Sequence, residues 1–408
     1  MTPEPHAHTP LTIRLYLRHD PRASIAGLPA SPGVLLLTGQ EDAPLQIAAT
    51  GNLRDFATAR LHPDADLGPR ADLRPLAHML HAATVGSPLE ADLLTLDLAR
   101  THLPGTYRAL TDRAHCWVLR LDPDAEPPTW KRIDPREVLK APVPPAPSTL
   151  LGPFPSKNDP VRLGELLDDA FELCRYPREL AKAPHGSACA YKDMGCPGAC
   201  DGSETLTAYA RRAQMAHDFA VCAHTDRDSD AHDLLEAQMR DASQAQQFEH
   251  AARLKQRLER LRDVNAPAFR ALGSLESLAL LGVAPSEKRG RARLILFIGG
   301  DWHPLADVDP DADDDTLTKL EDAVRSALDA SGAFPVTAPA IERLSVFARH
   351  WFRPASRART RRLTVFDLRR GLPGRTELVR AARLAGEPTD HPEQDFGETD
   401  LSGPESVR

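Results

Sequence analysis

A cluster of four cysteines constrains the fold of this chain more than any other feature of its sequence. The four lie within 27 residues, separated by fourteen, six and three residues, and are Cys174, Cys189, Cys196 and Cys200. Soft thiolates at such loop spacings suit zinc or an iron–sulfur cluster, and Pro197-Gly198 provides a tight turn that aims two sulfurs at one centre. We therefore predict one metal centre, with His185 as a substitute ligand for zinc; four buried free cysteines are the alternative.

The remaining composition is that of a globular protein with several domains. The chain has 408 residues, of which 41% are hydrophobic and 26% charged, and a chain of this length divides into roughly two to four domains. It contains no run of eighteen apolar residues, and its opening Met-Thr-Pro-Glu-Pro-His lacks the features of a signal peptide. We expect a cytoplasmic protein with no membrane partner, in which Cys116 and Cys222 are ordinary core residues.

Charge is distributed unevenly along the chain. The net charge of −8 does not indicate a nucleic-acid-binding protein, yet residues 341–384 hold twelve arginines against three acidic residues, and the tail after Ala385 is acidic. A basic stripe beside an acidic tail can bind DNA phosphates with the tail as competitor; the alternative is a solvated helix face and a disordered end. The candidate DNA contacts are Arg353, Arg357, Arg359, Arg361 and Arg362.

Short β-type runs alternate with helical spacing, which predicts an α/β (α+β) multidomain protein. The predicted strands are residues 33–38, 44–49, 115–121, 291–298 and 363–367. The predicted helices are residues 52–61, 88–102, 315–330 and 340–352, with a helical hairpin at 230–263. The predicted units are a first α/β domain at 23–140, a proline-rich linker at 141–150, a cysteine module at 151–227, the hairpin at 228–266, a C-terminal α/β segment at 270–384 and a disordered acidic tail at 385–408.

The helical hairpin is the clearest interaction element. Apolar residues recur at intervals of three and four on both predicted helices. Two helices this short bury little surface alone, which favours packing on a partner hairpin; packing on the flanking domains is the alternative. The predicted partner-binding residues are Leu235, Met239, Phe248, Leu254 and Leu258.

Several segments resemble the UvrC/Cho family of GIY-YIG excision-repair nucleases. Leu28-Pro-Ala-Ser-Pro-Gly-Val-Leu35, with Leu45-Gln-Ile-Ala-Ala-Thr-Gly-Asn-Leu-Arg54, is similar to the opening of the nuclease domain. Residues 152–155 resemble the join after that domain, and residues 189–202 resemble the cysteine signature of the family. The hairpin resembles the UVR motif, and the segment after Leu272 resembles the non-catalytic C-terminus of Cho-like proteins. The RNase H-like half of UvrC has no counterpart in the chain.

The resemblance implies a nuclease domain that has lost its site. A GIY-YIG site uses tyrosines to assist the attacking water, an arginine to stabilise the phosphorane and a glutamate to hold a metal. On the family pattern the two tyrosines fall on Leu35 and Gln46, the arginine on Phe56 and the glutamate on Thr95. None of these side chains can replace the one lost, and Asp97 is expected on the opposite helix face from Thr95. A domain that is not GIY-YIG at all is the alternative.

The resemblance also implies a cofactor, a partner and a role. It implies a 4Fe–4S cluster on the four cysteines, with zinc as the alternative, a small mixed sheet in the first domain, and a UvrB-like partner at the hairpin. The predicted function is nucleotide excision repair by a pseudo-nuclease that binds this partner, DNA or both. Two alternatives are an active metal-dependent DNA endonuclease with substituted residues and a protein–protein adaptor without a DNA role.

Overall fold

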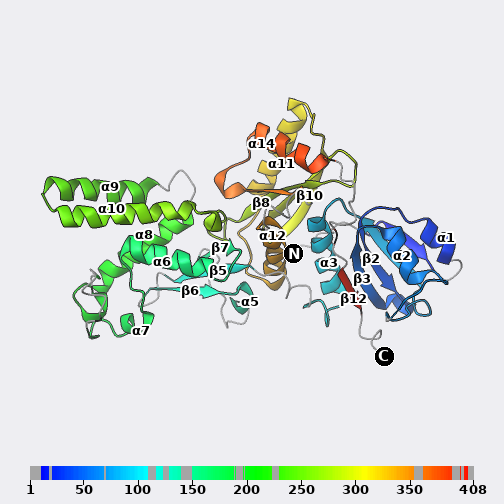
Figure 1. Cartoon of the computed structure of the whole chain (residues 1–408), viewed down its shortest axis with the longest axis horizontal. Coiled ribbons are helices and arrows are strands. Elements are labelled where there is room, and N and C mark those ends of the chain that lie inside the picture. Colours follow the sequence, from blue (N-terminus) through cyan, green and yellow to red (C-terminus); the bar gives the residue numbers. More distant parts are fainter. Residues whose placement is uncertain are drawn as a thin grey trace.

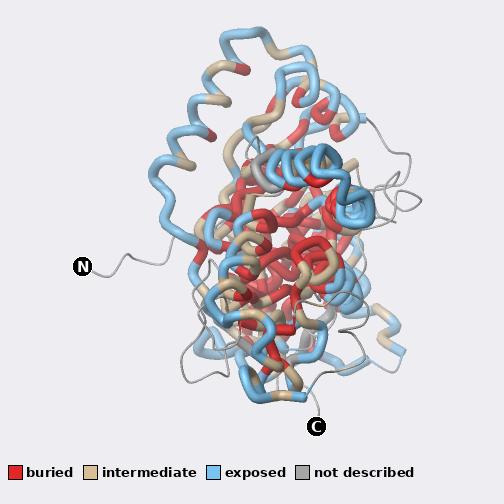
Figure 2. The backbone as a smooth tube through the Cα atoms, turned by 90° about the vertical axis from the view of Figure 1, so that its left-hand side faces the viewer, coloured by how far each residue is buried: buried red, intermediate tan, exposed pale blue. Residues whose placement is uncertain are grey.

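The chain folds into three small antiparallel sheets surrounded by helices, as a computed structural model shows (Figure 1). This architecture confirms the predicted α/β multidomain class. The described residues are 11–17, 21–68, 70–108, 116–122, 128–138, 149–187, 189, 196, 198–222, 229–352, 362–387, 396 and 399–402. Buried residues run through the middle of the molecule (Figure 2). Within the described residues, no helix combines the length and the apolar character needed to span a membrane.

The first unit is built on a five-stranded sheet with the order β1-β4-β2-β3-β12. Its strands are β1 (Ile13–Tyr16), β2 (Gly33–Thr38), β3 (Pro44–Thr50), β4 (Met79–Thr84) and β12 (Thr399–Ser402). Every pairing described in this sheet is antiparallel, so the sheet is not the mixed one that we predicted. β2 is buried at all six positions because helices cover both faces of the sheet.

Alternate residues of β2 contact different helices. Leu35 and Leu37 belong to the core beneath α1 (Pro21–Ala26) and α2 (Leu53–Leu61). Val34 and Leu36 face the other way, into the core formed with α3 (Pro88–His102). Asn52 and Ser87 cap α2 and α3 by accepting a backbone N–H, which starts both helices where their sequences predict.

The acidic tail is partly ordered, which corrects the prediction of a disordered segment at 385–408. Thr399–Ser402 forms β12, which pairs antiparallel with β3 and places Thr399 opposite Ala49 and Ser402 opposite Gln46. The pairing satisfies backbone groups along the edge of β3 that an open sheet leaves exposed. A four-residue strand in a charged context carries little sequence signal, which explains why the pattern did not reveal it.

The second sheet crosses a predicted domain boundary. It has the order β6-β5-β7 and consists of β5 (Trp117–Asp122), β6 (Thr129–Ile133) and β7 (Leu150–Phe154). The sequence assigns β5 and β6 to the first domain, at 23–140, but β5 pairs with β6 on one side and β7 on the other, in a sheet separate from the first. α5 (Pro135–Val138) follows β6, and most of the proline-rich stretch at 141–150 lies outside the described residues.

The middle of the chain is mostly helical. After β7 come α6 (Asp159–Phe171), α7 (Pro177–Leu180), the 3-10 turn η4 (Ala199–Asp201) and α8 (Leu206–Cys222). The predicted hairpin is formed by α9 (Ser229–Gln244) and α10 (Phe248–Arg262), and it projects from one end of the molecule (Figure 1). Two further 3-10 turns, η6 (Asp263–Asn265) and η7 (Pro267–Phe269), lead from α10 toward the last unit.

The C-terminal segment forms the third sheet, with the order β10-β9-β8-β11. Its strands are β8 (Ala279–Pro285), β9 (Ala292–Ile298), β10 (Asp301–Val308) and β11 (Thr364–Asp367). Its helices are α11 (Asp314–Ala330), α12 (Ala338–Trp351) and α14 (Arg375–Gly386), with the 3-10 turn η8 (Leu368–Arg370) before α14. The first and third sheets share one hydrophobic core, in which α3 packs against α12.

Candidate metal centre and partner-binding hairpin

The first cysteine follows the end of α6. Glu172 adopts a left-handed conformation, with φ 55° and ψ 44°, and ends the helix. The chain therefore turns sharply, and Cys174 follows two residues later. The backbone N–H of Cys174 donates to the hydroxyl of Tyr209 at 3.2 Å. Tyr209 lies on α8 and is 3% exposed, so a buried side chain holds the backbone that carries the first thiol.

Two arginines from other helices hold the end of α6. Arg212 of α8 donates to the carbonyl oxygens of Phe171 at 3.0 Å and Glu172 at 3.1 Å, and its guanidinium also pairs with Glu204. Arg257 of α10 donates to the carbonyl oxygen of Ala170 at 2.6 Å and lies 3.3 Å from the Glu172 carboxylate. Cations here satisfy the last carbonyls of the helix and oppose the negative end of its dipole.

The last cysteine is fixed by a close backbone approach. The N–H of Gly186 donates to the carbonyl oxygen of Cys200 at 2.8 Å. A Cβ on Gly186 would lie 2.7 Å from that oxygen, so only glycine fits. Gly198, in the predicted turn, has φ +83°, which favours glycine, and Asp201 accepts the N–H of Ser203 at 3.0 Å. The loop therefore holds Cys200 in a buried position.

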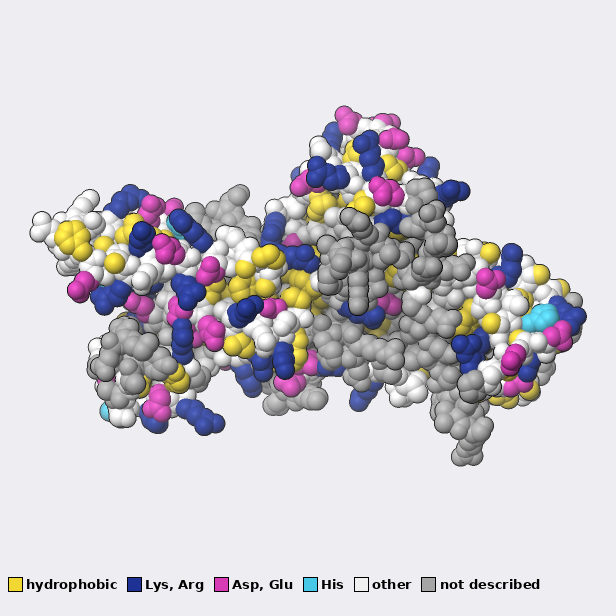
Figure 3. Space-filling view, viewed as in Figure 1, with side chains coloured by type: hydrophobic (Ala, Val, Ile, Leu, Met, Phe, Trp, Pro, Cys, Tyr) yellow, Lys and Arg dark blue, Asp and Glu magenta, His cyan; other side chains and the backbone are white. Residues whose placement is uncertain are grey.

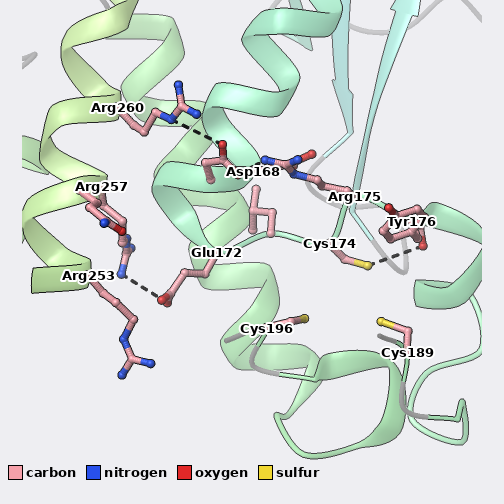
Figure 4. A pocket seen from close by; sticks show the side chains of 13 residues that line it. Asp168, Glu172, Cys174, Arg175, Tyr176, Cys189, Cys196, Arg253, Arg257 and Arg260 are labelled. Carbon is pink, nitrogen blue, oxygen red and sulfur yellow. Dashed lines mark hydrogen bonds and ion pairs between the residues drawn. The ribbon is translucent and has the colours of Figure 1, made fainter. Parts of the chain in front are cut away.

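The four cysteines line two adjoining cavities. One of about 390 Å³ is lined by Cys174, Cys189 and Cys196 (Figure 4). A much smaller one is lined by Cys174, Cys196 and Cys200. The sulfurs of the three labelled cysteines point into the same space in Figure 4. The structure thus brings together the residues that the spacing predicted as ligands, while His185 is exposed and lines neither cavity.

The thiols occupy a partly buried, arginine-rich environment. The pKa of Cys174 is raised to about 11, mainly by burial and in smaller part by the neighbouring thiols of Cys196, Cys200 and Cys189. Arg175, Arg253, Arg257 and Arg260 line the larger cavity, where Arg257 pairs with Glu172 (Figure 4). Four thiols around two adjoining cavities, with arginine side chains beside them, are a suitable donor set for a metal centre, whose thiolate ligands carry negative charge.

Sequence reasoning missed the residues that position the cysteines. Tyr209, Arg212 and Arg257 lie on helices far along the chain from Cys174. No local motif contains them, because they act through contacts that form only when α8 and α10 pack beside α6. The sequence gives only a weak indication of their role. The three polar side chains occur on helix faces whose other residues are apolar.

The predicted hairpin residues divide between the core and the surface. Leu235, Leu254 and Leu258 are buried, and Met239 is half-buried, because the hairpin packs against α6 and α8 in the core of the chain. These four do not form a free surface, which corrects their assignment as partner-binding residues. Phe248 is 66% exposed at the start of α10. Hydrophobic side chains are visible at the free end of the hairpin in Figure 3.

Three of the four positions of the implied nuclease site, Leu35, Gln46 and Thr95, are buried in the first unit. Leu35 is fully buried in the core under α2, and the partly buried Phe56 packs against the same core. Gln46 is fully buried in β3, and Thr95 is 1% exposed on α3, across the sheet from α2. Asp97 accepts hydrogen bonds from Trp302 and Arg343, both at 2.8 Å. It therefore joins α3 to the C-terminal unit.

The candidate DNA contacts are only partly described. Arg353, Arg357, Arg359 and Arg361 lie outside the described residues. Arg362 is half-buried and has a left-handed φ of 46°. DNA contact by this segment stays a prediction.

Two known families match the parts of the chain that carry the cysteines and the hairpin. Residues 128–219 match the middle domain of the UvrC/Cho excinuclease, and this match contains all four clustered cysteines. Residues 231–264 match the UvrB/uvrC motif, which covers most of the α9–α10 hairpin. The chain is UvrC-like.

This UvrC-like chain is also similar to whole proteins of that name. It is 26% identical over 235 residues to the UvrABC system protein C of Syntrophotalea carbinolica. This match covers 57% of this chain and 36% of the relative. It is 23% identical over 282 residues to the UvrABC system protein C of a Geobacter species. This match covers 68% of this chain and 41% of the relative. The UvrC-like chain thus spans about two fifths of the length of these relatives, and no solved structure matches it.

Proposed function

We propose that this chain is a nucleotide-excision-repair protein that has lost GIY-YIG catalysis and acts by binding a UvrB-like partner through its hairpin. The observation that carries the proposal is the exposed Phe248 at the free end of a hairpin that matches the UvrB/uvrC motif. The likeness to UvrABC system proteins supports the repair role.

The hairpin has a buried base and an exposed tip. Its inward leucines join the core with α6 and α8, so the base is part of the body of the protein. Residues 243–250, around the loop between the two helices, are all exposed. Binding anchors are typically large apolar side chains that become desolvated in a partner's pocket. Phe248 is the large apolar residue of this tip. Because the base of the hairpin is already packed, the hairpin loses little conformational entropy when Phe248 binds a partner.

We expect Phe248→Ala to weaken binding to purified UvrB. Truncation of an aromatic anchor costs about 2 kcal/mol or more, which is roughly a 30-fold increase in Kd. The thermal stability of the variant should match that of the parent protein, because the side chain is mostly exposed. Isothermal titration calorimetry measures the first quantity and differential scanning calorimetry the second.

Leu384→Ala is the matched control for this experiment. Leu384 is an exposed apolar residue, 42% exposed, on α14 of the C-terminal unit. Its truncation should leave the Kd for UvrB unchanged. Equal Kd values for the parent and both variants would show that the hairpin tip is not the binding surface.

The loss of nuclease activity is proposed from the position of α3. Nine residues of this helix are buried, including Thr95 and Asp97, because the helix lies between the first sheet and α12 (Figure 1). A metal held at Thr95 would therefore have no access to a DNA strand. Threonine, leucine and phenylalanine also cannot supply the carboxylate, proton or positive charge that the reaction requires.

We expect no Mg²⁺-dependent nicking of plasmid DNA by the purified chain. Nicking is measured by the conversion of supercoiled plasmid to open circles, alone and with UvrA, UvrB and ultraviolet-damaged plasmid. An active UvrC serves as the positive control under the same conditions. Cleavage that persists through purification and disappears in a Gln46→Ala variant would place activity in the first unit and contradict the proposal.

The cysteine centre is proposed to hold a 4Fe–4S cluster with a structural role. Cys174, Cys189, Cys196 and Cys200 would be its ligands, and when bound it would supply one cross-link among four points of the chain. Soft thiolates suit such a cluster, and all four cysteines lie in the part of the chain that matches the UvrC/Cho middle domain, which supports the proposal.

The chain's own residues explain what such a centre would hold in place. In the described part of residues 174–200, the regular elements are α7 and the start of η4. Cys174 contacts α8 through Tyr209, and Arg212 and Arg257 hold the end of α6 that precedes Cys174. Arg257 belongs to the hairpin, so the same contacts that support Cys174 also fix the base of α10. The centre would thereby stabilise the platform from which the hairpin tip projects.

A further inference from the structure

Three potential metal ligands converge at the base of the hairpin, away from the cysteines. His232, Asp233 and Glu236 lie near the start of α9, and one ligand atom from each lies within 4.8 Å of the others. His232 and Glu236 are four residues apart, so they share one helix face a single turn apart. His232 and Glu236 are half-buried and Asp233 is exposed, so their side chains can rotate toward a common ion.

Two of these residues, His232 and Asp233, also border a pocket of about 250 Å³. Its floor consists of the apolar side chains of Phe219, Leu261 and Val264, which are all buried. Its polar rim includes His232, Asp233 and Asn265, and the amide oxygen of Asn265 can serve as a further ligand. A hollow with an apolar floor and converging nitrogen and oxygen atoms is the usual setting of a small-ligand or ion site.

The balance of charge around the pocket favours a cation. Asp233 and Glu236 contribute two negative charges, and α8 and α10 both end at the pocket, where Phe219 and Leu261 lie in their last turns. The carboxyl ends of helices carry partial negative charge. Two features oppose a cation: Arg262 on the rim and the amino end of α9. Arg262 is exposed and can extend into solvent.

Glu236 already has a cationic neighbour. Its carboxylate lies 3.2 Å from the guanidinium of Arg240, one turn further along α9, in a pair that is 42% and 65% exposed. Exposed pairs of this kind contribute little free energy. A metal ion at His232 would therefore replace Arg240 as the partner of Glu236 at small cost.

We propose that His232, Asp233 and Glu236 form a binding site for one divalent transition-metal ion, with Zn²⁺ the expected ion. Imidazole nitrogen favours zinc over magnesium and calcium, and zinc accepts carboxylate oxygens at about 2.0–2.2 Å. Such bonds bring the ligand atoms to about 3.5 Å apart, which requires small rotations from the spacing seen here. The site uses no cysteine and does not depend on the proposed function.

The test is a metal titration of the full chain with its cysteine centre loaded. Zn²⁺ binding is measured by calorimetry, and Co²⁺ is used as a spectroscopic substitute for zinc. The parent protein should bind one equivalent that His232→Gln binds at least tenfold more weakly. Glu236→Gln should weaken the same equivalent, which guards against a folding defect in the first variant. The Co²⁺ spectrum of this equivalent should lack sulfur-to-metal charge-transfer absorption.

His250→Gln is the matched control, because His250 is an exposed histidine on the other helix of the hairpin. It should retain the equivalent that the other variants weaken. Three results would overturn the proposal: unchanged binding in His232→Gln and Glu236→Gln, an equal loss in His250→Gln, or a charge-transfer band that assigns the equivalent to thiolates.

Discussion

Asp97→Ala is expected to lower the free energy of unfolding by about 3–5 kcal/mol, the usual cost of removing one partner of a buried ion pair. Asp97 accepts from the indole N–H of Trp302 at 2.8 Å and from Arg343 at 2.8 Å. Both donors belong to the C-terminal unit, and the Asp97 and Arg343 side chains are only 9% and 14% exposed. The substitution therefore leaves the largely buried Arg343 guanidinium with Asp301, 3.4 Å away, in place of two carboxylates. It also creates a cavity and weakens the contact between α3 and the C-terminal unit.

Urea unfolding followed by tryptophan fluorescence measures this effect, because Trp302 itself reports on the interface. Asp64→Ala is the matched control: Asp64 pairs with Arg22 on the surface, where the two side chains are 72% and 60% exposed. Its loss should cost no more than about 1 kcal/mol. If Asp97→Ala proved as mild as Asp64→Ala, α3 would not depend on the C-terminal unit for its stability.

A double-mutant cycle separates the pair from its surroundings. Asp97→Asn retains an acceptor for Trp302 but removes the charge that faces Arg343. Combined with Arg343→Met, it should cost less than the sum of the two single changes, by about 0.5–3 kcal/mol. Strict additivity would show that the two side chains do not interact in solution.

Cys200→Ser is expected to abolish the metal centre. Changes to groups that merely support a ligand cost roughly 10–100-fold in metal affinity, and loss of a direct ligand costs more. Cys200 is 4% exposed, and the hydrogen bond from Gly186 fixes its backbone, so no other thiol can take its place. Protein purified anaerobically should show the visible absorption and iron content of a 4Fe–4S cluster, and the variant should show neither.

Cys222→Ser controls for the general effect of removing a thiol. Cys222 ends α8 and lines neither cysteine cavity, so its replacement should leave iron content and absorption unchanged. A colourless parent protein that contains one zinc per chain would retain the four ligands but overturn the iron–sulfur assignment. Metal content that is unaffected by Cys200→Ser would overturn the ligand set itself.

Features that depend on a few neighbouring residues could be predicted from the sequence. Capping by Asn52 and Ser87 and the apolar spacing after them place α2 and α3. β2 was predicted with its observed ends. The set of four cysteines is predicted because they lie within 27 residues of the chain. In each case the determining interaction spans a single turn, cap or strand, so the local sequence contains it.

The tertiary structure decided which elements meet, and this changed the interpretation of several residues. β5 reads as a strand, but only its pairing with β7 assigns it to the cysteine module. The sequence predicts Leu254 as a partner-binding residue, because helical spacing reveals an apolar face but not which element packs on that face. In the structure, α6 packs on this face. Thr95 is inaccessible because α12 packs on α3, which depends on residues more than two hundred positions away. By itself, the sequence predicted several of the helices and strands and the set of thiols. Burial and strand pairing are properties of contacts between distant segments, so only the folded chain decided which of those residues remained free to bind.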